Sequence, residues 1–102
     1  MRQFDLYENP ISSMRAAVPL VVVLSSHLAA GLTETIVAPV LRGRTTTVGA
    51  FEIPLERDDV ALLISVTGMT AVRQTDLRHK IGSAIEHEDA IRRALDRLFT
   101  GF

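Results

Sequence analysis

The chain has 102 residues, of which 47% are hydrophobic and 23% are charged, and these values predict one ordered domain with a single core. With 11 basic and 12 acidic residues the net charge is −1, so no excess of positive charge favours nucleic acid or a membrane surface. The absence of cysteine excludes disulfides, thiolate chemistry and cysteine-based zinc sites. The N-terminal sequence lacks an apolar signal core, and the run Ala16–Leu24 is too short to span a bilayer, so we expect a cytoplasmic protein.

Short runs of β-forming residues, separated by turn residues such as Asn9-Pro10, occupy most of the chain before residue 80. Strands are predicted at Phe4–Tyr7, Ala17–Ser25, Thr35–Leu41, Thr45–Val48, Phe51–Leu55, Val60–Val66 and Met69–Val72. Three prolines lie within or beside these strands, Pro19 and Pro39 among them, which indicates edges and bulges such as those at barrel corners. Five to seven short strands of this kind predict a small antiparallel barrel or a strongly bent sheet.

The last 18 residues carry the strongest periodic pattern, one apolar stripe on a helix. The residues of the stripe are Ile91, Ala94, Leu95, Leu98, Phe99 and Phe102. Ser83 and Glu86 have the spacing of a capping box, and Gly101 stands where a helix usually ends. We therefore predict strands over about 3–80 and a helix over about 84–99 that covers one face of the sheet, giving an α+β, mostly β, fold.

The residues themselves predict neither catalysis nor metal binding. None of His27, His79 and His87 has a partner at metal-ligand spacing. The Ser25-Ser26-His27 sequence puts a hydroxyl beside an imidazole, but adjacent residues seldom face each other and no glycine elbow surrounds them. We expect no catalytic residue, no metal and no cofactor.

Five segments, in this order over nearly the whole chain, resemble one known family. They are Phe4–Tyr7, Val22–Leu28, Ile36–Val40, Met69–Val72 and Ile91–Phe102, the last with the pattern I-x-x-A-L-x-x-L-F followed by glycine and one apolar residue. Together they resemble the CcdB toxin family, plasmid and chromosomal toxins that act on DNA gyrase. The resemblance implies one CcdB-like toxin domain over residues 1–102, a small SH3-like antiparallel barrel or bent sheet with one long C-terminal helix.

In functional terms the resemblance implies a homodimer that binds the A subunit of gyrase, traps the cleaved DNA complex and catalyses no reaction itself. A small CcdA-like antitoxin with a disordered tail would neutralise it, and no direct contact with nucleic acid is expected. The implied target-binding residues are Asp96, Phe99, Thr100, Gly101 and Phe102 at the helix end and His27 and Leu28 in a loop.

Two alternatives follow from departures and from related folds. The best-known toxic members of the family have tryptophan before the final glycine, where this chain has Thr100, and end in isoleucine, where it has Phe102. The first alternative is therefore a homologue that has lost or changed its gyrase target. The second is a ribonuclease, because toxins with a related small barrel cleave RNA. That chemistry needs a basic groove and an acid–base pair, and the arginines and histidines of this chain are spread thinly along it.

Overall fold

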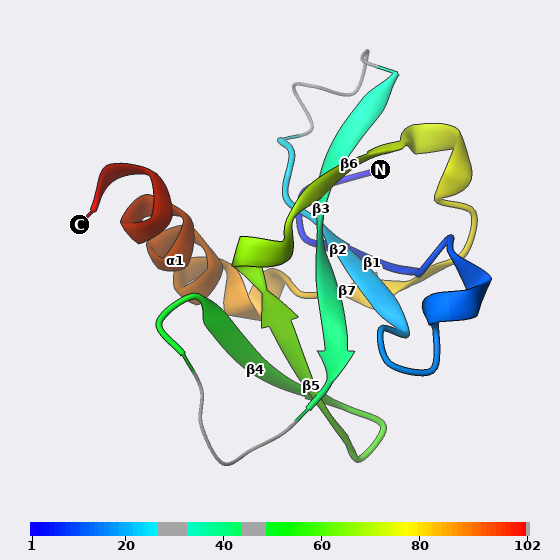
Figure 1. The fold of residues 1–102 in the computed structure, drawn as a ribbon, viewed down its shortest axis with the longest axis horizontal. Helices are drawn as coiled ribbons and strands as arrows, with labels where there is room; N and C mark the ends of the chain where they lie inside the picture. The colour runs from blue at the N-terminus through cyan, green and yellow to red at the C-terminus, as the bar shows by residue number, and fades with distance from the viewer. Residues whose placement is uncertain (27–32, 44–48, 102) are drawn as a thin grey trace.

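The computed structural model describes residues 1–26, 33–43 and 49–101, and the sequence expectations that fall on 27–32, 44–48 and 102 lie outside them. Within the described ranges, an antiparallel sheet of seven strands curls into a half-barrel, with one α-helix beside it (Figure 1). The elements are β1 (Asp5–Glu8), β2 (Leu20–Val23), β3 (Glu34–Arg42), β4 (Glu52–Arg57), β5 (Val60–Ser65), β6 (Thr70–Arg73), β7 (Lys80–Ser83) and α1 (Glu88–Thr100). The predicted α+β, mostly β, class is confirmed. Among the described helices, none has the length and apolarity that a membrane crossing requires.

The sheet is built around β3, the longest strand. The strand order is β4-β5-β3-β2-β1-β7, and β6 pairs with β3 on the same edge as β5. Val40–Arg42 pair with β5 and Glu34–Val37 pair with β6, so Ala38 and Pro39 have a strand partner only in β2. On the edge of β3 that faces β5 and β6, no strand pairs with Pro39, so the missing N–H of proline leaves no hydrogen bond unmade there. This break explains how a proline lies inside a central strand rather than at a sheet edge or bulge.

The 3₁₀ turn Val66–Gly68 connects β5 to β6 and crosses β3 at this break. A Cβ at Gly68 would lie 2.8 Å from Cγ of Pro39, so only glycine allows the turn to approach the proline ring this closely.

The core has two parts because β2 is buried on both of its faces. Leu20–Val23 form a continuous run of buried apolar residues, as expected for a strand covered on both sides. The larger cluster packs α1 against the sheet through Ile91 and Ala94, and includes Leu6, Val22 and Ile64. The smaller cluster lies on the opposite face of β1, β2 and β3; its members are Tyr7, Val21, Val23, Val37 and Leu77, with Val72 packed against them.

The helix begins later than the sequence predicts, and the reason is local. The hydroxyl of Ser83 accepts a hydrogen bond from the amide of Ile85 at 3.2 Å, and Ile85–His87 form a 3₁₀ turn before α1 starts at Glu88. His87, at the N-cap position, makes no side-chain capping bond. The predicted capping box is therefore wrong, whereas the predicted C-cap is confirmed: Gly101 is left-handed, with φ of 79°, and donates to the carbonyl of Arg97 at 3.1 Å.

The two ends of the sheet are joined by one side chain. β4 and β7 are the first and last strands of the path, and Nη2 of Arg57 donates to the carbonyl of Ile81 at 2.6 Å. Leu6 pairs with Gly82 and Tyr7 pairs with Lys80, so Ile81 is the extra residue of a bulge in β7. The carbonyl that accepts the bond from Arg57 therefore belongs to this bulged residue.

Candidate functional site

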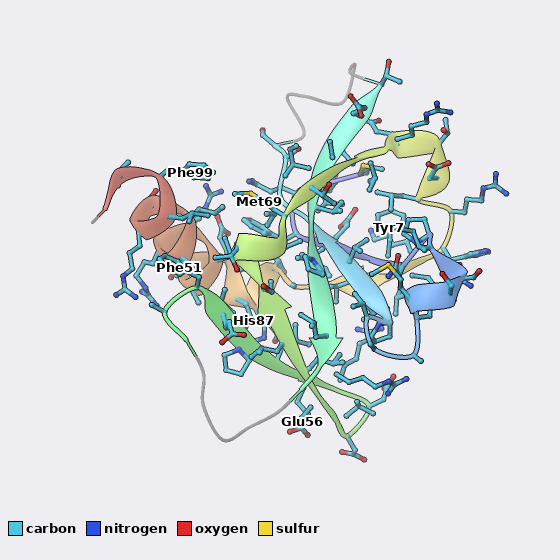
Figure 2. All side chains as sticks on the ribbon, viewed as in Figure 1. Tyr7, Phe51, Glu56, Met69, His87 and Phe99 are labelled. Atoms are coloured by element: carbon cyan, nitrogen blue, oxygen red, sulfur yellow. The ribbon has the colours of Figure 1, made fainter. Side chains whose placement is uncertain are left out.

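The C-terminal end of α1 projects from the barrel (Figure 1), whereas its first turns pack against the core of the sheet. Ile91 is fully buried and Ala94 nearly so, and Leu95 and Leu98 pack partly against the same core. The apolar stripe predicted from the sequence therefore contacts the sheet as far as Leu98. Phe99 departs from it, because 70% of its surface is exposed. Figure 2 shows Phe99 at the outer end of the helix.

A second set of contacts fixes the helix to the N-terminal segment. The guanidinium of Arg92 lies 5.4 Å from the ring centroid of Phe4, a cation–π contact. The same side chain donates to Glu88 at 2.7 Å, as its i, i+4 spacing predicts, and to the side chain of Gln3 at 3.3 Å. These contacts fix the orientation of α1 relative to the barrel, and therefore also the direction in which its C-terminal end points.

The last turn of α1 combines an exposed aromatic ring with an accessible backbone at Gly101. The hydroxyl of Thr100 donates to the carbonyl of Asp96 at 2.5 Å, so it is used within the helix. Asp96, Thr100 and Gly101 are exposed, and a Cβ at Gly101 would meet no atom within 4 Å. A large exposed aromatic side chain beside an accessible backbone is suited to binding a protein surface.

The structure thus brings together four of the residues that the sequence indicates, namely Asp96, Phe99, Thr100 and Gly101. His27, Leu28 and Phe102 lie outside the described residues. Of the serines next to His27, Ser25 has a structural role, because its Oγ accepts a hydrogen bond from the amide of Ile36 at 2.7 Å.

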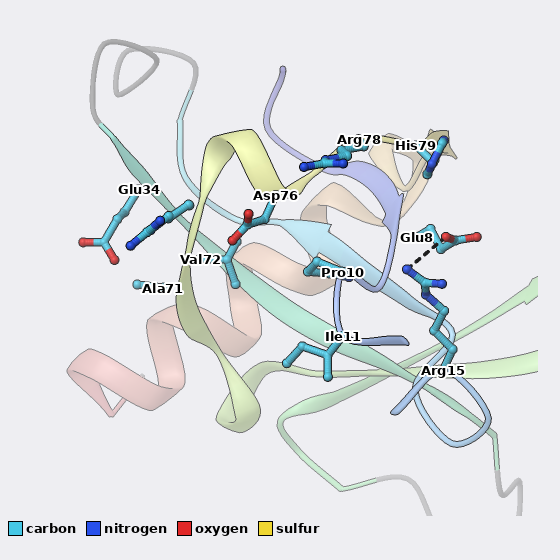
Figure 3. Close-up of a pocket in the computed structure, with 11 residues that line it drawn as sticks. Glu8, Pro10, Ile11, Arg15, Glu34, Ala71, Val72, Asp76, Arg78 and His79 are labelled. Carbon is cyan, nitrogen blue, oxygen red and sulfur yellow. Dashed lines mark ion pairs between the residues drawn. The ribbon is translucent and has the colours of Figure 1, made fainter. Parts of the chain in front are cut away.

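A pocket of about 630 Å³ lies elsewhere, and none of its lining residues belongs to α1. It lies between the segment that follows β1 and the segment that leads from β6 to β7 (Figure 3). Its floor includes Pro10, Ile11 and Val72. Its charged or titratable residues are Glu8, Arg15, Glu34, Arg73, Asp76, Arg78 and His79.

The sequence does not predict this cluster of charged residues, because its members come from separate segments of the chain. Arg15 forms an ion pair with Glu8 at 3.2 Å, and Glu34 lies opposite Arg73 in the register of β3 and β6. The amide of Glu8 donates to the carbonyl of His79 at 2.9 Å, which places these two residues across from each other on adjacent chains. Only the pairing of β7 with β1 brings them together, and no strand was predicted at Lys80–Ser83. Within the described ranges, this pocket included, no group of three or more histidine, aspartate or glutamate side chains is placed to hold a metal ion.

The fold belongs to a class of small half-barrels with one C-terminal helix, and solved toxin structures share it. The crystal structure of a toxin from Mtb has 25% sequence identity and a TM-score of 0.67, covering 82% of this chain and 94% of that one. The Mycobacterium tuberculosis toxin MazF-mt6 has 20% identity and a TM-score of 0.70, with 96% of each chain covered, and shows the shared fold. The comparison with curated proteins gave no match.

The family is given by the sequence match. Residues 3–101 match the family described as CcdB protein, so the chain belongs to the CcdB family. The match spans the strands, α1 and the exposed last turn together.

Proposed function

We propose that this protein is the toxin of a type II toxin–antitoxin system, which binds the A subunit of DNA gyrase with the end of α1 and traps the cleaved DNA complex. Membership of the CcdB family supports a toxin, and so does the 25%-identical Mtb toxin. The observation that carries the choice of site is the 70% exposure of Phe99 on a helix whose other apolar residues are at least partly buried against the core.

The protein would inhibit gyrase by binding it with the end of α1, without catalysing a reaction. Burying an exposed phenylalanine side chain contributes about 1.5–3 kcal/mol of favourable free energy. Gly101 adds no side chain, so a partner can approach the backbone closely at the helix end. Since α1 is fixed at its base by Ile91 and Arg92, little conformational freedom is lost on binding. Phe102, His27 and Leu28 extend the proposed contact surface.

The proposal also includes a homodimer, a CcdA-like antitoxin and a cytoplasmic location, where gyrase works on DNA. The family supports pairing with an antitoxin in general. Light scattering at micromolar concentration tests the dimer, and a mass equal to one chain of 11.2 kDa would refute it.

The test of the target is a gyrase cleavage assay with supercoiled plasmid, ATP and purified protein. Linear DNA should accumulate with the intact chain, and Phe99→Ala should need at least about tenfold more protein for the same effect, as expected for loss of an interface anchor. Ile85→Ala is the matched control, because Ile85 is 55% exposed and lies before the first turn of the same helix. Equal poisoning by both variants would move the site away from the end of α1, and no poisoning by the intact chain would reject gyrase as the target.

A retargeted homologue is the second candidate, and one specific observation favours it. Thr100 stands where the best-known toxic members carry tryptophan, and its hydroxyl donates to the carbonyl of Asp96, so it offers a partner little apolar surface. If gyrase is unaffected, the same exposed helix end remains the site to test against other protein targets.

A further inference from the structure

Two arginines of α1 have no ionic partner within the described part of the chain. Arg92 forms an ion pair with Glu88, four residues before it, at 2.7 Å. Asp89 stands at the same spacing before Arg93, but in the described structure no ion pair joins them, and Arg97 has none either. The helix dipole favours Arg97 in the last turn but falls off before Arg93. Two unpaired guanidiniums, which repel each other at this i, i+4 spacing, therefore lie one turn apart on the helix.

Both arginines line a groove between α1 and the start of β4. The groove has a volume of about 280 Å³, and Figure 1 shows the two elements side by side. Its floor is apolar and includes the buried side chains of Ile53 and Ala94. Among the described lining residues the one carboxylate is that of Glu52, and it accepts a hydrogen bond from the amide of Gly49 at 2.8 Å. The groove therefore combines an apolar floor with an excess of positive charge.

The groove and the exposed ring of Phe99 lie on different sides of the same helix end. Phe99 stands two helical turns after Arg92, so these two residues share one side of α1. The contact of Arg92 with Phe4 assigns that side to the N-terminal segment, whereas the groove lies toward β4. A protein that surrounds the helix end and covers Phe99 can therefore place a second segment in the groove.

The spacing of the two arginines suits an extended acidic segment. A guanidinium pairs with a carboxylate through two parallel N–H donors. Side chains one turn apart on a helix have Cβ atoms about 5–6 Å apart, and alternate residues of an extended chain are about 6.6–6.8 Å apart. Two carboxylates in a Glu-x-Glu sequence can thus meet Arg93 and Arg97 together, while apolar residues of the same segment contact the floor of the groove.

Other kinds of ligand fit the groove less well. A nucleic acid backbone makes no use of an apolar floor, and a protein with a net charge of −1 has little general attraction for it. A free small molecule usually occupies a pocket of about 300–1,000 Å³, and this groove is smaller. A protein segment is therefore the favoured occupant.

We propose that the groove between α1 and β4 is a docking surface for an acidic segment of the protein that α1 binds, with Arg93 and Arg97 each holding a carboxylate. This inference deepens the proposed function and rests on it in one respect, that α1 is the binding element. It states which kind of segment the target presents, and it does not require that the target be gyrase. The two arginines then select among targets, because a basic segment at the same place would be repelled.

The first test measures binding of short fluorescent peptides to the full-length protein by fluorescence anisotropy. One peptide contains the sequence Glu-Leu-Glu, its control contains Gln-Leu-Gln, and a labelled DNA duplex is the third probe. The acidic peptide should bind more tightly than both others, and added salt should weaken its binding. Arg93→Ala or Arg97→Ala should raise its Kd by about three- to fivefold, as for an exposed ion pair, and the double variant by about tenfold.

The matched control is the double variant Arg73→Ala with Arg78→Ala, which removes two exposed arginines that do not line the groove and should leave the Kd unchanged. Circular dichroism verifies that each variant is folded. Equal binding of the two peptides, or equal weakening by the control variant, would overturn the proposal. Tighter binding of the DNA duplex than of the acidic peptide would overturn it in favour of a nucleic acid.

A second test separates this proposal from the choice of gyrase as target. Surface plasmon resonance gives the Kd for the gyrase A subunit, which the double variant of Arg93 and Arg97 should raise by about tenfold. If Phe99→Ala weakens this binding and the double variant does not, the docking proposal fails and the proposed function stands. If the acidic peptide binds as expected and the gyrase A subunit does not bind, the docking proposal stands and gyrase is rejected.

Discussion

The guanidinium of Arg57 lies directly over the α-carbon of Gly82 and so spans the opening between the first and last strands of the sheet. A Cβ at Gly82 would be 2.6 Å from Nη1 of Arg57, and the neighbouring Nη2 donates to the carbonyl of Ile81 at 2.6 Å. The guanidinium of Arg57 can reach the carbonyl of Ile81 only because residue 82 has no side chain. β7 leads directly into the turn before α1, so this closure lies close to the base of the helix.

Gly82→Ala should destabilise the protein by displacing the guanidinium and breaking its bond to Ile81. The expected loss in the free energy of unfolding is about 1 kcal/mol, the usual net worth of one hydrogen bond. Arg57→Ala should cost about the same, and the double variant should cost little more than either single one, because both remove one interaction. Urea unfolding of the four proteins measures this coupling. Additive losses would show that the two residues act independently, and Arg93→Ala serves as a control for removing an exposed arginine.

Ile91→Ala should be among the most damaging substitutions on α1. Ile91 is fully buried in the cluster that joins the helix to the sheet, and removing such a side chain typically costs about 2–5 kcal/mol. Phe99→Ala should change stability by less than about 0.5 kcal/mol, because most of the ring is in solvent. Thermal unfolding compares the two. A large loss for Phe99→Ala would mean that the ring is packed in solution, which would remove the main support for a binding site there.

Thr100→Trp should strengthen binding to the gyrase A subunit. The change gives up the hydroxyl bond to Asp96 but adds a large rigid surface next to Phe99, and interface tryptophans are often worth about 2 kcal/mol or more. We expect the Kd, measured by surface plasmon resonance, to fall by about tenfold or more. Thr100→Val, which removes only the hydroxyl, separates the two contributions. No gain from tryptophan would support a target other than gyrase.

Arg92→Ala should loosen the attachment of α1 to the N-terminal segment. It removes the contact with the ring of Phe4 and the bonds to Glu88 and Gln3, for an expected cost of about 1 kcal/mol. Hydrogen exchange should become faster in the first turn of α1. Arg92→Lys keeps the charge without the planar fork and should recover only part of the protection. If the rate of hydrogen exchange is the same in Arg92→Ala as in the intact protein, burial of Ile91 and Ala94 is enough to hold the helix without the contacts of Arg92.

The sequence predicts the elements whose pattern is local and misses those that depend on pairing. The stripe that includes Ile91 and Ala94 is a property of one segment, and the helix forms within that segment, although it begins at Glu88 rather than near residue 84. By contrast, Lys80–Ser83 has no alternating pattern, and its conformation comes from pairing with β1. Because Glu8 and His79 meet only through that pairing, the polar pocket could not be inferred from the chain. The exposure of Phe99 is another tertiary effect, since periodicity cannot say where a helix runs past the edge of the sheet that it covers.

The pairing of Asp5 with Ser83 has a further consequence for how the protein is made. This contact joins residues near the two ends of the chain, and contacts of such long sequence separation slow folding. During synthesis β1 must wait until β7 has left the ribosome before its second partner exists. The segment that follows, α1 with its exposed end, emerges later still. A ribosome-bound fragment that ends before β7 therefore has neither a complete barrel nor the surface proposed to bind gyrase, so a partly synthesised chain should be harmless to the cell that produces it.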